Sequence, residues 1–259
     1  MILPDLHTNP VPLDRDQHRL LRLRFDRHDN DRLATLNSCF IVAGEFGEAC
    51  KEYPLLWIRA GQDDKGAPQV APIAVFGLAK QTNLCIDRGS WRTLYQPVVL
   101  RLYPFALGRP SSEQWVMCYD ASSPRFSLTD GEPLFEPDGK PSALTLDVQK
   151  QLEQVEADVE RTRQAGAELL RLDLLREMRF EAKLPDGREH AVEGFLTVDD
   201  KRFAELPDAE VLALHRKGVL GLIHAHQLSL SNMRRFAQWH AERPDLAAAT
   251  PAAVPPAQP

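Results

Sequence analysis

A regular spacing of apolar residues between residues 145 and 177 constrains the fold of this chain more than any other feature. Steps of four and three alternate along one stripe, which consists of Val148, Leu152, Val155, Val159, Thr162, Gly166 and Leu169. Residues spaced in this way lie on one side of an α-helix. The sequence therefore predicts a long amphipathic helix over Thr145–Glu177 that lies on a sheet or on another helix. Thr162 and Gly166 interrupt the run of large apolar side chains that a contact between two such helices would need. A two-chain coiled coil is therefore less favoured.

Short apolar runs predict strands before and after this helix. The runs are Leu55–Arg59, Val70–Leu78, Asn83–Asp87, Trp115–Tyr119, Arg179–Leu184 and Glu189–Val198. Connections between the first three runs are too short for helical crossovers, which favours antiparallel pairing. Asp186-Gly187 separates the last two runs, and this dipeptide is a strong hairpin signal.

Several further helices complete the predicted fold. Ala43–Glu52 and Trp91–Leu107 have helical spacing of apolar residues, and a C-terminal pair covers residues 207–217 and Val219–His240. The predicted fold class is α+β, a mostly antiparallel sheet packed with one long amphipathic helix and a C-terminal helical pair. We expect a single domain over residues 1–241 and a disordered Ala/Pro-rich tail over residues 242–259.

Charge and hydropathy exclude several classes of protein. The chain of 259 residues has 31 Lys and Arg against 37 Asp and Glu, a net charge of −6, which argues against a basic nucleic-acid-binding domain. No apolar run approaches the roughly 18 residues of a membrane-spanning helix. Residues 1–16 lack the basic and apolar segments of a signal peptide. We therefore expect a cytoplasmic protein with no membrane span and no nucleic-acid partner.

The sequence predicts neither a metal nor another cofactor. The four cysteines are far apart and none lies in a CxxC pair, so a structural zinc site is not expected. No glycine-rich dinucleotide loop, Lys-containing phosphate loop or Gly-x-Ser-x-Gly motif occurs. His224 and His226 are two residues apart and would point in different directions on a helix.

Seven stretches follow one another between residues 11 and 236 in the order found in one protein family. They are PLDRDQHRLLRL, AGEFGEACKEYPLLWIR, LRLYPFAL, DASSPRFSLTDGEPLF, the long helix, GFLTVDD and LHRKGVLGLIHAHQLSLSNMRRF. On these stretches the chain resembles the SapC family of bacterial surface-layer-associated proteins. The resemblance implies association with a cell-surface protein layer or with its export. It brings no established catalytic mechanism, cofactor or ligand set.

A polar strip crosses an otherwise apolar helix face near the C-terminus. His226, Ser229 and Asn232 are spaced by three residues and share this face with Leu222 and Met233. Buried polar groups need hydrogen-bond partners. The strip is therefore either a network that fixes the helix against the segment Asp120–Phe135 or the wall of a pocket for a small polar ligand or a peptide, and we favour the network.

Two other groups of residues are candidates for a site. Asp120 and Glu132 lie in a long irregular segment, and paired carboxylates can perform acid/base chemistry when burial separates their pKa values. Arg101, Tyr103 and Phe105 could form, with Arg92, an aromatic and cationic patch for a peptide or carboxylate ligand. The candidate binding residues are Arg101, Tyr103, Asp120, Glu132, His226, Ser229 and Asn232.

No complete catalytic constellation accompanies these candidates. The leading hypothesis is a non-enzymatic accessory or binding protein that engages a protein or peptide, such as a surface-layer or export component. One alternative is a metal-assisted or acid/base enzyme that uses His226 with Asp120 and Glu132. The other is a structural component of the surface layer itself. The sequence leaves the oligomeric state open.

Overall fold

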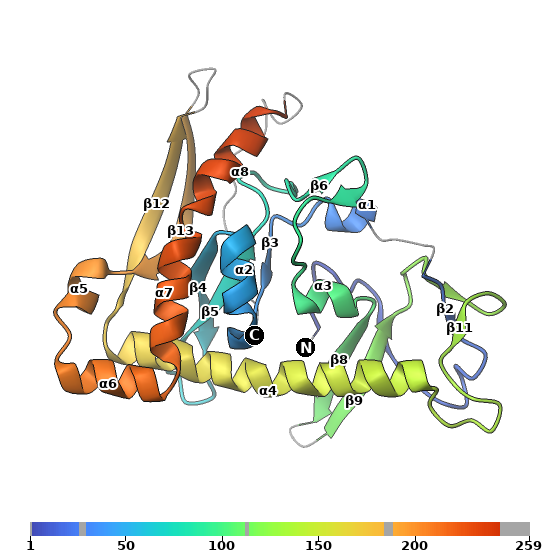
Figure 1. Ribbon diagram of the computed structural model, residues 1–259. Helices are drawn as coiled ribbons and strands as arrows, with labels where there is room; N and C mark the ends of the chain where they lie inside the picture. The colour runs from blue at the N-terminus through green and yellow to red at the C-terminus, as the bar shows by residue number, and fades with distance from the viewer. Residues whose placement is uncertain (1, 26–29, 112–113, 184–188, 244–259) are drawn as a thin grey trace. The chain divides into compact units, whose positions relative to one another are not determined.

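The path of the chain alternates between two compact units in the computed structural model, shown in Figure 1. Unit 1 combines Met1–Leu33 with Val98–Ala157, and unit 2 combines Ala34–Pro97 with Asp158–Pro259. The structure describes residues 2–25, 30–111, 114–183 and 189–243. Most of the predicted tail lies outside the described residues, and the single domain over residues 1–241 stays a prediction.

Both units combine helices with antiparallel strands, so the predicted α+β class is confirmed. Among the described residues, no helix is both long enough and apolar enough to cross a membrane.

Unit 2 is built around a five-stranded sheet with the order β12-β13-β4-β5-β3. Its strands are β3 (Ser38–Phe40), β4 (Leu55–Gln62), β5 (Pro68–Val75), β12 (Leu175–Lys183) and β13 (Glu189–Val198), with a separate small pair β6 (Ile86–Asp87) and β7 (Ser90–Trp91). Its shorter helices are η1 (Ala43–Glu45), α2 (Phe46–Glu52), α5 (Asp200–Ala204), α6 (Asp208–Arg216), α7 (Val219–Ser229) and α8 (Asn232–Ala241). Helix α7 packs against α2, β4 and β13. This packing buries Ile223 and Phe46 in the core of the unit.

Unit 1 contains two three-stranded sheets, with the orders β1-β9-β8 and β10-β2-β11. Its elements are β1 (Pro10–Pro12), β2 (Arg22–Leu23), α1 (Asn30–Leu33), α3 (Val98–Leu102), β8 (Phe105–Ser111), β9 (Gln114–Asp120), β10 (Phe126–Ser127) and β11 (Glu132–Pro133). Phe126 of β10 packs edge-to-face on Phe105 and Tyr119, at ring-centroid distances of 5.6 and 4.9 Å. These aromatic contacts join the two sheets of the unit.

The predicted long helix is α4 (Ala143–Arg171), whose first half belongs to unit 1 and whose second half belongs to unit 2. Gly166 explains one gap in its apolar stripe, because a Cβ atom there would lie 3.0 Å from both the side chain and the carbonyl oxygen of Val70. Thr162 explains the other, since its hydroxyl accepts a hydrogen bond from the N–H of Ala43 at 2.7 Å. Both residues adapt the helix to its contacts within unit 2.

Helix α4 ends six residues before the predicted position of Glu177. Asp173 adopts a left-handed conformation with φ of 51°, and the N–H groups of Asp173 and Leu174 donate to the carbonyl oxygens of Leu170 and Leu169. These two bonds form a Schellman motif, which satisfies the last helical carbonyls. The chain can therefore enter β12 at Leu175 without a further turn.

Two predicted helices were wrong in extent. Within Trp91–Leu107 only Val98–Leu102 is helical, because prolines at 97 and 104 limit it and the following apolar run forms β8. The predicted helix Val219–His240 divides into α7 and α8, since Leu230 and Ser231 form tighter turns with Gln227 and Leu228.

The predicted hairpin is confirmed as β12 and β13, although its turn lies outside the described residues. Strand β13 is paired with β4 only through Leu196 and Trp57, so most of the hairpin forms a two-stranded ribbon beside the sheet. The register shifts between Met178 and Phe180, where β13 carries an extra residue and Gly194 has a φ of 95°. The bulge therefore belongs to β13, and β12 is a regular strand at the edge of the sheet.

Candidate functional site

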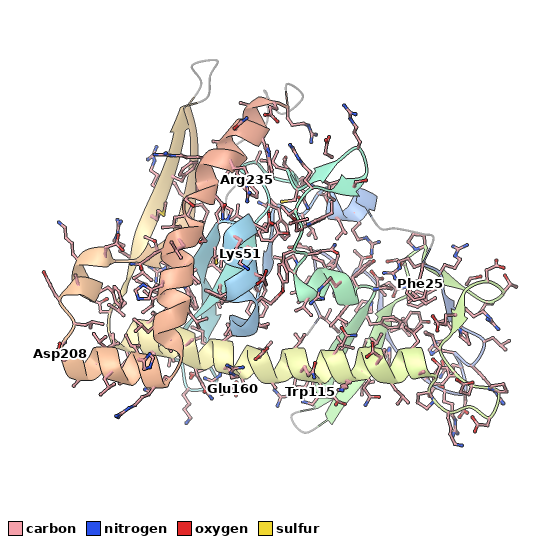
Figure 2. All side chains as sticks on the ribbon, in the orientation of Figure 1. Phe25, Lys51, Trp115, Glu160, Asp208 and Arg235 are labelled. Carbon is pink, nitrogen blue, oxygen red and sulfur yellow. The ribbon has the colours of Figure 1, made fainter. Side chains whose placement is uncertain are left out.

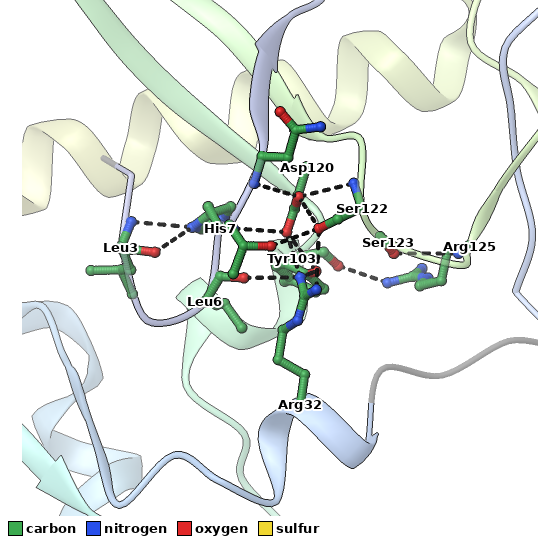
Figure 3. A network of polar contacts seen from close by, with 11 residues as sticks. Leu3, Leu6, His7, Arg32, Tyr103, Asp120, Ser122, Ser123 and Arg125 are labelled. Carbon is green, nitrogen blue, oxygen red and sulfur yellow. Dashed lines mark hydrogen bonds and ion pairs between the residues drawn. The ribbon is translucent and has the colours of Figure 1, made fainter. Parts of the chain in front are cut away.

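Asp120 ends β9 and is the buried centre of a polar cluster in unit 1, shown in Figure 3. Its carboxylate accepts six hydrogen bonds. The donors are the N–H groups of Thr8, Asn9 and Ser122 at 3.2, 3.0 and 3.1 Å, the hydroxyls of Ser122 and Tyr103 at 2.5 and 2.9 Å, and Arg32 Nη1 at 2.5 Å. Every lone pair of the carboxylate is therefore directed at a donor within the unit.

The hydrogen bonds to Asp120 determine its protonation. Burial alone would raise the pKa of this carboxyl, but the hydrogen bonds from Ser122, Tyr103 and Asn9 outweigh it and lower the pKa to about 2. Asp120 is thus a carboxylate at neutral pH. A group with so low a pKa is a poor general base, because it holds a proton only in strong acid.

The segment before β1 is folded onto this cluster. Arg32 also donates to the carbonyl oxygen of Leu6 at 3.2 Å and to Ser122 Oγ at 3.1 Å. His7 is buried, and its Nδ1 accepts a hydrogen bond from the N–H of Leu3 at 3.1 Å. Burial lowers the pKa of His7, which keeps the ring neutral beside Tyr103. The cluster therefore joins the N-terminal segment to the end of β9.

The other candidates in unit 1 do not form the patch that the sequence predicts. Tyr103 and Phe105 are 2% and 3% exposed, so neither aromatic ring is available at the surface. Arg101 is an exposed residue of α3. Glu132 is an exposed residue of β11, opposite Leu23 in the register with β2. Of these residues, only Tyr103 belongs to the Asp120 cluster.

His226 is the buried centre of a second polar cluster, in unit 2. Its Nδ1 lies 2.8 Å from the carbonyl oxygen of Leu55, and its Nε2 accepts a hydrogen bond from the N–H of Val198 at 3.2 Å. The hydroxyl of Thr197 lies 2.9 Å from the same Nε2. An Nε2 that accepts must be unprotonated, so the hydrogen bonds select the neutral ring with its proton on Nδ1.

Burial lowers the pKa of His226 to about 4, against the opposing effect of the hydrogen bond to Leu55. The ring is therefore neutral at physiological pH, yet its one lone pair is already directed at the backbone of β13. A metal or a substrate proton at Nε2 would have to displace that hydrogen bond.

Ser229 and Asn232 continue the cluster along the backbone of residues 50–55. Ser229 Oγ accepts a hydrogen bond from the N–H of Leu55 at 2.9 Å. Asn232 Nδ2 donates to the carbonyl oxygens of Cys50 and Tyr53 at 2.8 and 3.1 Å. The sequence placed this strip against Asp120–Phe135 or in a pocket wall, whereas its hydrogen bonds go to the connection between α2 and β4.

Arg235 adds a fourth member that the sequence analysis missed. It lies three residues beyond Asn232 and donates to the carbonyl oxygens of Lys51, at 3.4 Å, and Glu52. Figure 2 labels Arg235 on α8 and Lys51 on α2. The position of Arg235 continues the spacing of three residues, which is the signal that could have found it. The four side chains thus satisfy the backbone where α2 ends and β4 begins.

A family model described as SapC matches residues 13–236 of the chain. The chain belongs to the SapC family. No curated protein and no solved structure matched the chain. The SapC match covers the residues of both polar clusters except Thr8, Asn9 and the segment that precedes them.

A third buried network of this SapC-family chain also escaped the sequence analysis. The hydroxyl of Tyr53 lies 2.6 Å from Thr93 Oγ1 and accepts a hydrogen bond from Trp91 Nε1 at 3.0 Å. Tyr95 donates to the buried Glu45 at 2.7 Å. These residues lie up to fifty positions apart, so no local spacing connects them. The network fixes the loop that follows β7.

Leu94 lies between the two anchored residues of that loop and is 98% exposed. Its neighbours Thr93 and Tyr95 are held by the buried network, and the N–H of Arg92 donates to the carbonyl oxygen of Cys85 at 2.7 Å. A leucine side chain is thus presented to solvent by a loop whose backbone is tied to the core of unit 2.

Within the described ranges, no three His, Cys, Asp or Glu side chains are grouped so that they could hold a metal ion. Cys39, Cys85 and Cys118 are buried free thiols, and Cys50 is a half-buried one. Burial raises the pKa of each of these thiols, so they are protonated at neutral pH. A protonated thiol is a weak nucleophile and a weak metal ligand.

Proposed function

We propose that the chain is a non-enzymatic binding protein that engages a protein partner through the Leu94 loop. One observation carries the proposal. The side chain of Leu94 is exposed to solvent, while hydrogen bonds hold both of its neighbours, Thr93 and Tyr95, in place. A loop that is ordered before binding loses little conformational entropy when a partner closes over it. An apolar side chain presented in this way suits insertion into a pocket of another protein.

The environment of the polar candidates favours binding over catalysis. The Asp120 carboxylate accepts six hydrogen bonds and has a pKa of about 2, which leaves it unsuited to proton transfer at neutral pH. The Nε2 lone pair of His226 is taken by the backbone of β13. Their present roles are to hold backbone segments in place, and such roles explain their burial without chemistry.

The SapC resemblance adds the class of partner. We propose that the protein bound at Leu94 belongs to a bacterial surface layer or to its export route. The chain would then act as an accessory to that layer.

A photoreactive amino acid at position 94 tests the proposal in cells that naturally produce the chain. We expect a discrete crosslinked product whose second component is another protein, identified by mass spectrometry. The same amino acid at position 228, a 69% exposed leucine of the same unit, is the matched control. Equal products at both positions, or none at 94, would overturn the proposal.

A substitution provides the second readout. Leu94→Ser should change the free energy of unfolding by less than about 0.5 kcal/mol, because the side chain makes no buried contact. The variant should nevertheless lose the partner identified by crosslinking. Retention of that partner at wild-type affinity would show that Leu94 does not contribute to binding.

A further inference from the structure

Arg92 is an exposed residue of the Leu94 loop, and its guanidinium keeps its hydrogen-bond donors available. Its Nη2 lies 3.8 Å from the carboxylate of Glu242, which is too far for a hydrogen bond. Among the residues that the structure describes, no other acceptor is paired with this guanidinium. A guanidinium carries five N–H donors and stays charged at physiological pH. Arg92 can therefore bind an anion from outside the chain.

The indole of Trp239 on α8 holds this guanidinium in place. Arg92 Cζ lies 4.2 Å from the centroid of the Trp239 ring. Such a cation–π contact engages the charge of a guanidinium without using its N–H donors. The Arg92 side chain is 28% exposed, so a ligand can reach it. Because an ordered side chain loses less conformational entropy on binding than a freely rotating one, Arg92 is prepared for a ligand.

Arg92 and Leu94 are close neighbours on the exposed side of the loop. They flank Thr93, which is buried and whose Oγ1 lies 2.6 Å from the hydroxyl of Tyr53. Two residues span at most about 7 Å of backbone. A cation and an apolar side chain are therefore presented together, by a loop whose backbone is tied to the core of unit 2.

A carboxylate is the anion that suits Arg92 best. The planar guanidinium can donate two parallel hydrogen bonds to the two oxygens of one carboxylate. Glu242 leaves this role open, because one of its oxygens accepts a hydrogen bond from Gln238 Nε2 at 3.1 Å and the other stays 3.8 Å from Arg92. Arginine is also among the residues that contribute most to the free energy of binding at protein interfaces. A protein that covers Leu94 can supply the missing carboxylate from an aspartate or a glutamate.

We propose that the protein engaged at Leu94 presents an aspartate or glutamate side chain beside its pocket for Leu94, and that this carboxylate binds Arg92. The proposal rests on the proposed function, because it assigns the chemistry of the same partner. It gives that partner two linked features, an apolar pocket for a leucine and an acidic residue at the rim of the pocket. An ion pair beside an apolar contact favours one orientation of the two proteins and disfavours proteins that lack the carboxylate.

Crosslinking from position 94 in two arginine variants of the full chain tests the proposal. With the photoreactive amino acid at position 94, Arg92→Gln should lower the yield of the crosslinked partner by at least about tenfold, because it removes charge-assisted hydrogen bonds. Arg88→Gln is the matched control. It removes the same charge from an exposed arginine four residues earlier and should change the yield by less than about twofold. An Arg92→Gln chain that is folded by circular dichroism and crosslinks as well as the control would overturn the proposal.

Substitutions in the partner test the carboxylate while this chain stays unchanged. Mass spectrometry of the crosslinked product locates the part of the partner that meets position 94. Replacing one Asp or Glu there with Asn or Gln should weaken binding of the wild-type full chain by at least about tenfold in calorimetric titrations. Arginine at that position of the partner, combined with Arg92→Glu in this chain, should restore much of the lost affinity. The proposal is wrong if no acidic residue of that part of the partner affects binding.

The outcomes separate this proposal from the one on which it rests. A chain that yields no crosslinked protein at position 94 would overturn both. A protein that crosslinks at position 94 equally well with and without Arg92, and with and without its own acidic residues, would support the Leu94 site and overturn the carboxylate.

Discussion

The Asp120 cluster of unit 1 and the His226 cluster of unit 2 both hold distant backbone segments together, but the first is built around a charged group and the second around a neutral one. The central residue of each cluster, Asp120 or His226, is fully buried, and each cluster holds backbone segments that lie far apart in the sequence. Asp120 does so as an anion that collects six donors, one of them the guanidinium of Arg32. His226 does so as a neutral ring that donates to one carbonyl and accepts from one N–H group.

The difference shows how a buried group can be tolerated in two ways. A buried charge is expensive unless it is paired and its remaining lone pairs are hydrogen-bonded, so the Asp120 cluster needs many members at once. A neutral ring requires only two partners and no counter-ion. We therefore expect the Asp120 cluster to respond more strongly to the loss of a single group.

The largest effect is expected for Asp120→Asn. The amide keeps the shape of the side chain, but it removes the charge opposite Arg32 and turns an NH₂ group towards other donors. We expect the variant to lose about 3–5 kcal/mol of unfolding free energy, measured by urea denaturation. Asp130→Asn, an exposed residue of the same segment, should change it by less than about 0.5 kcal/mol. A loss at Asp120 no larger than that control would contradict the structural role of the charge.

His226→Ala should have the next largest effect. It leaves the N–H of Val198 and the carbonyl oxygen of Leu55 buried without their partner, which costs roughly 1–3 kcal/mol. His224→Ala, on an exposed side of the same helix, is the matched control. Thermal melts of both variants provide the comparison. A His226 variant as stable as wild type that lost binding to a partner would reassign this residue to a binding site.

The two clusters should lose their contributions to stability in different pH ranges. The pKa of His226 is about 4 in the folded state against 6.5 ordinarily, so below pH 6.5 the unfolded chain takes up a proton that the folded chain refuses. The His226 contribution is complete above pH 6.5 and declines as the pH falls to 4. The difference in stability between wild type and His226→Ala should therefore shrink by up to about 1.4 kcal/mol per pH unit in this range.

Asp120 is an acid and His226 is a base, but the contribution of each to stability is lost as the pH falls. Its pKa is about 2 in the folded state against 3.8 ordinarily, so the contribution is complete above pH 3.8 and is lost as the pH falls to 2. Unfolding free energies of wild type, His226→Ala and Asp120→Asn between pH 2.5 and 7.5 would separate the two ranges. If both contributions declined over the same pH range, the distinction between a charged and a neutral cluster would be wrong.

The smallest effect is expected for Ser229→Ala. The hydroxyl accepts one hydrogen bond from the N–H of Leu55, and the neighbouring His226 still holds the carbonyl of the same residue. We expect a loss of about 1 kcal/mol in urea denaturation. Ser231→Ala removes an exposed hydroxyl two residues away and should be close to neutral. A Ser229 variant as destabilised as Asp120→Asn would show that the neutral cluster is as demanding as the charged one.

Sequence patterns predicted the elements of this fold better than the atoms that its polar residues contact. The spacing of three and four residues revealed α4, and Asp186-Gly187 revealed the hairpin of β12 and β13, because both signals are local. The same local signal placed His226 on a buried face. It could not show that the partners of His226 are Leu55 and Val198, since these contacts depend on how distant segments pack.

The Asp120 cluster illustrates the same limit more strongly. Arg32 lies in a charge-dense run that is typical of a solvated connector, and 88 positions separate it from Asp120. Thr8 and Asn9 contribute backbone N–H groups, for which residue type carries no signal. The prediction of a two-carboxylate site with Glu132 rested on nearness in sequence, whereas Asp120 draws its partners from the N-terminal segment and from Tyr103.

The two edges of the unit 2 sheet differ in length, and this limits how an assembly could grow. Strand β12 has nine residues, whereas β3 at the far edge has three, Ser38–Phe40. A short edge strand presents few unpaired backbone N–H and C=O groups, so another strand cannot be added to β3 readily. The longer row of such groups along β12 has no such protection. Association through this sheet would therefore begin at β12 rather than at β3.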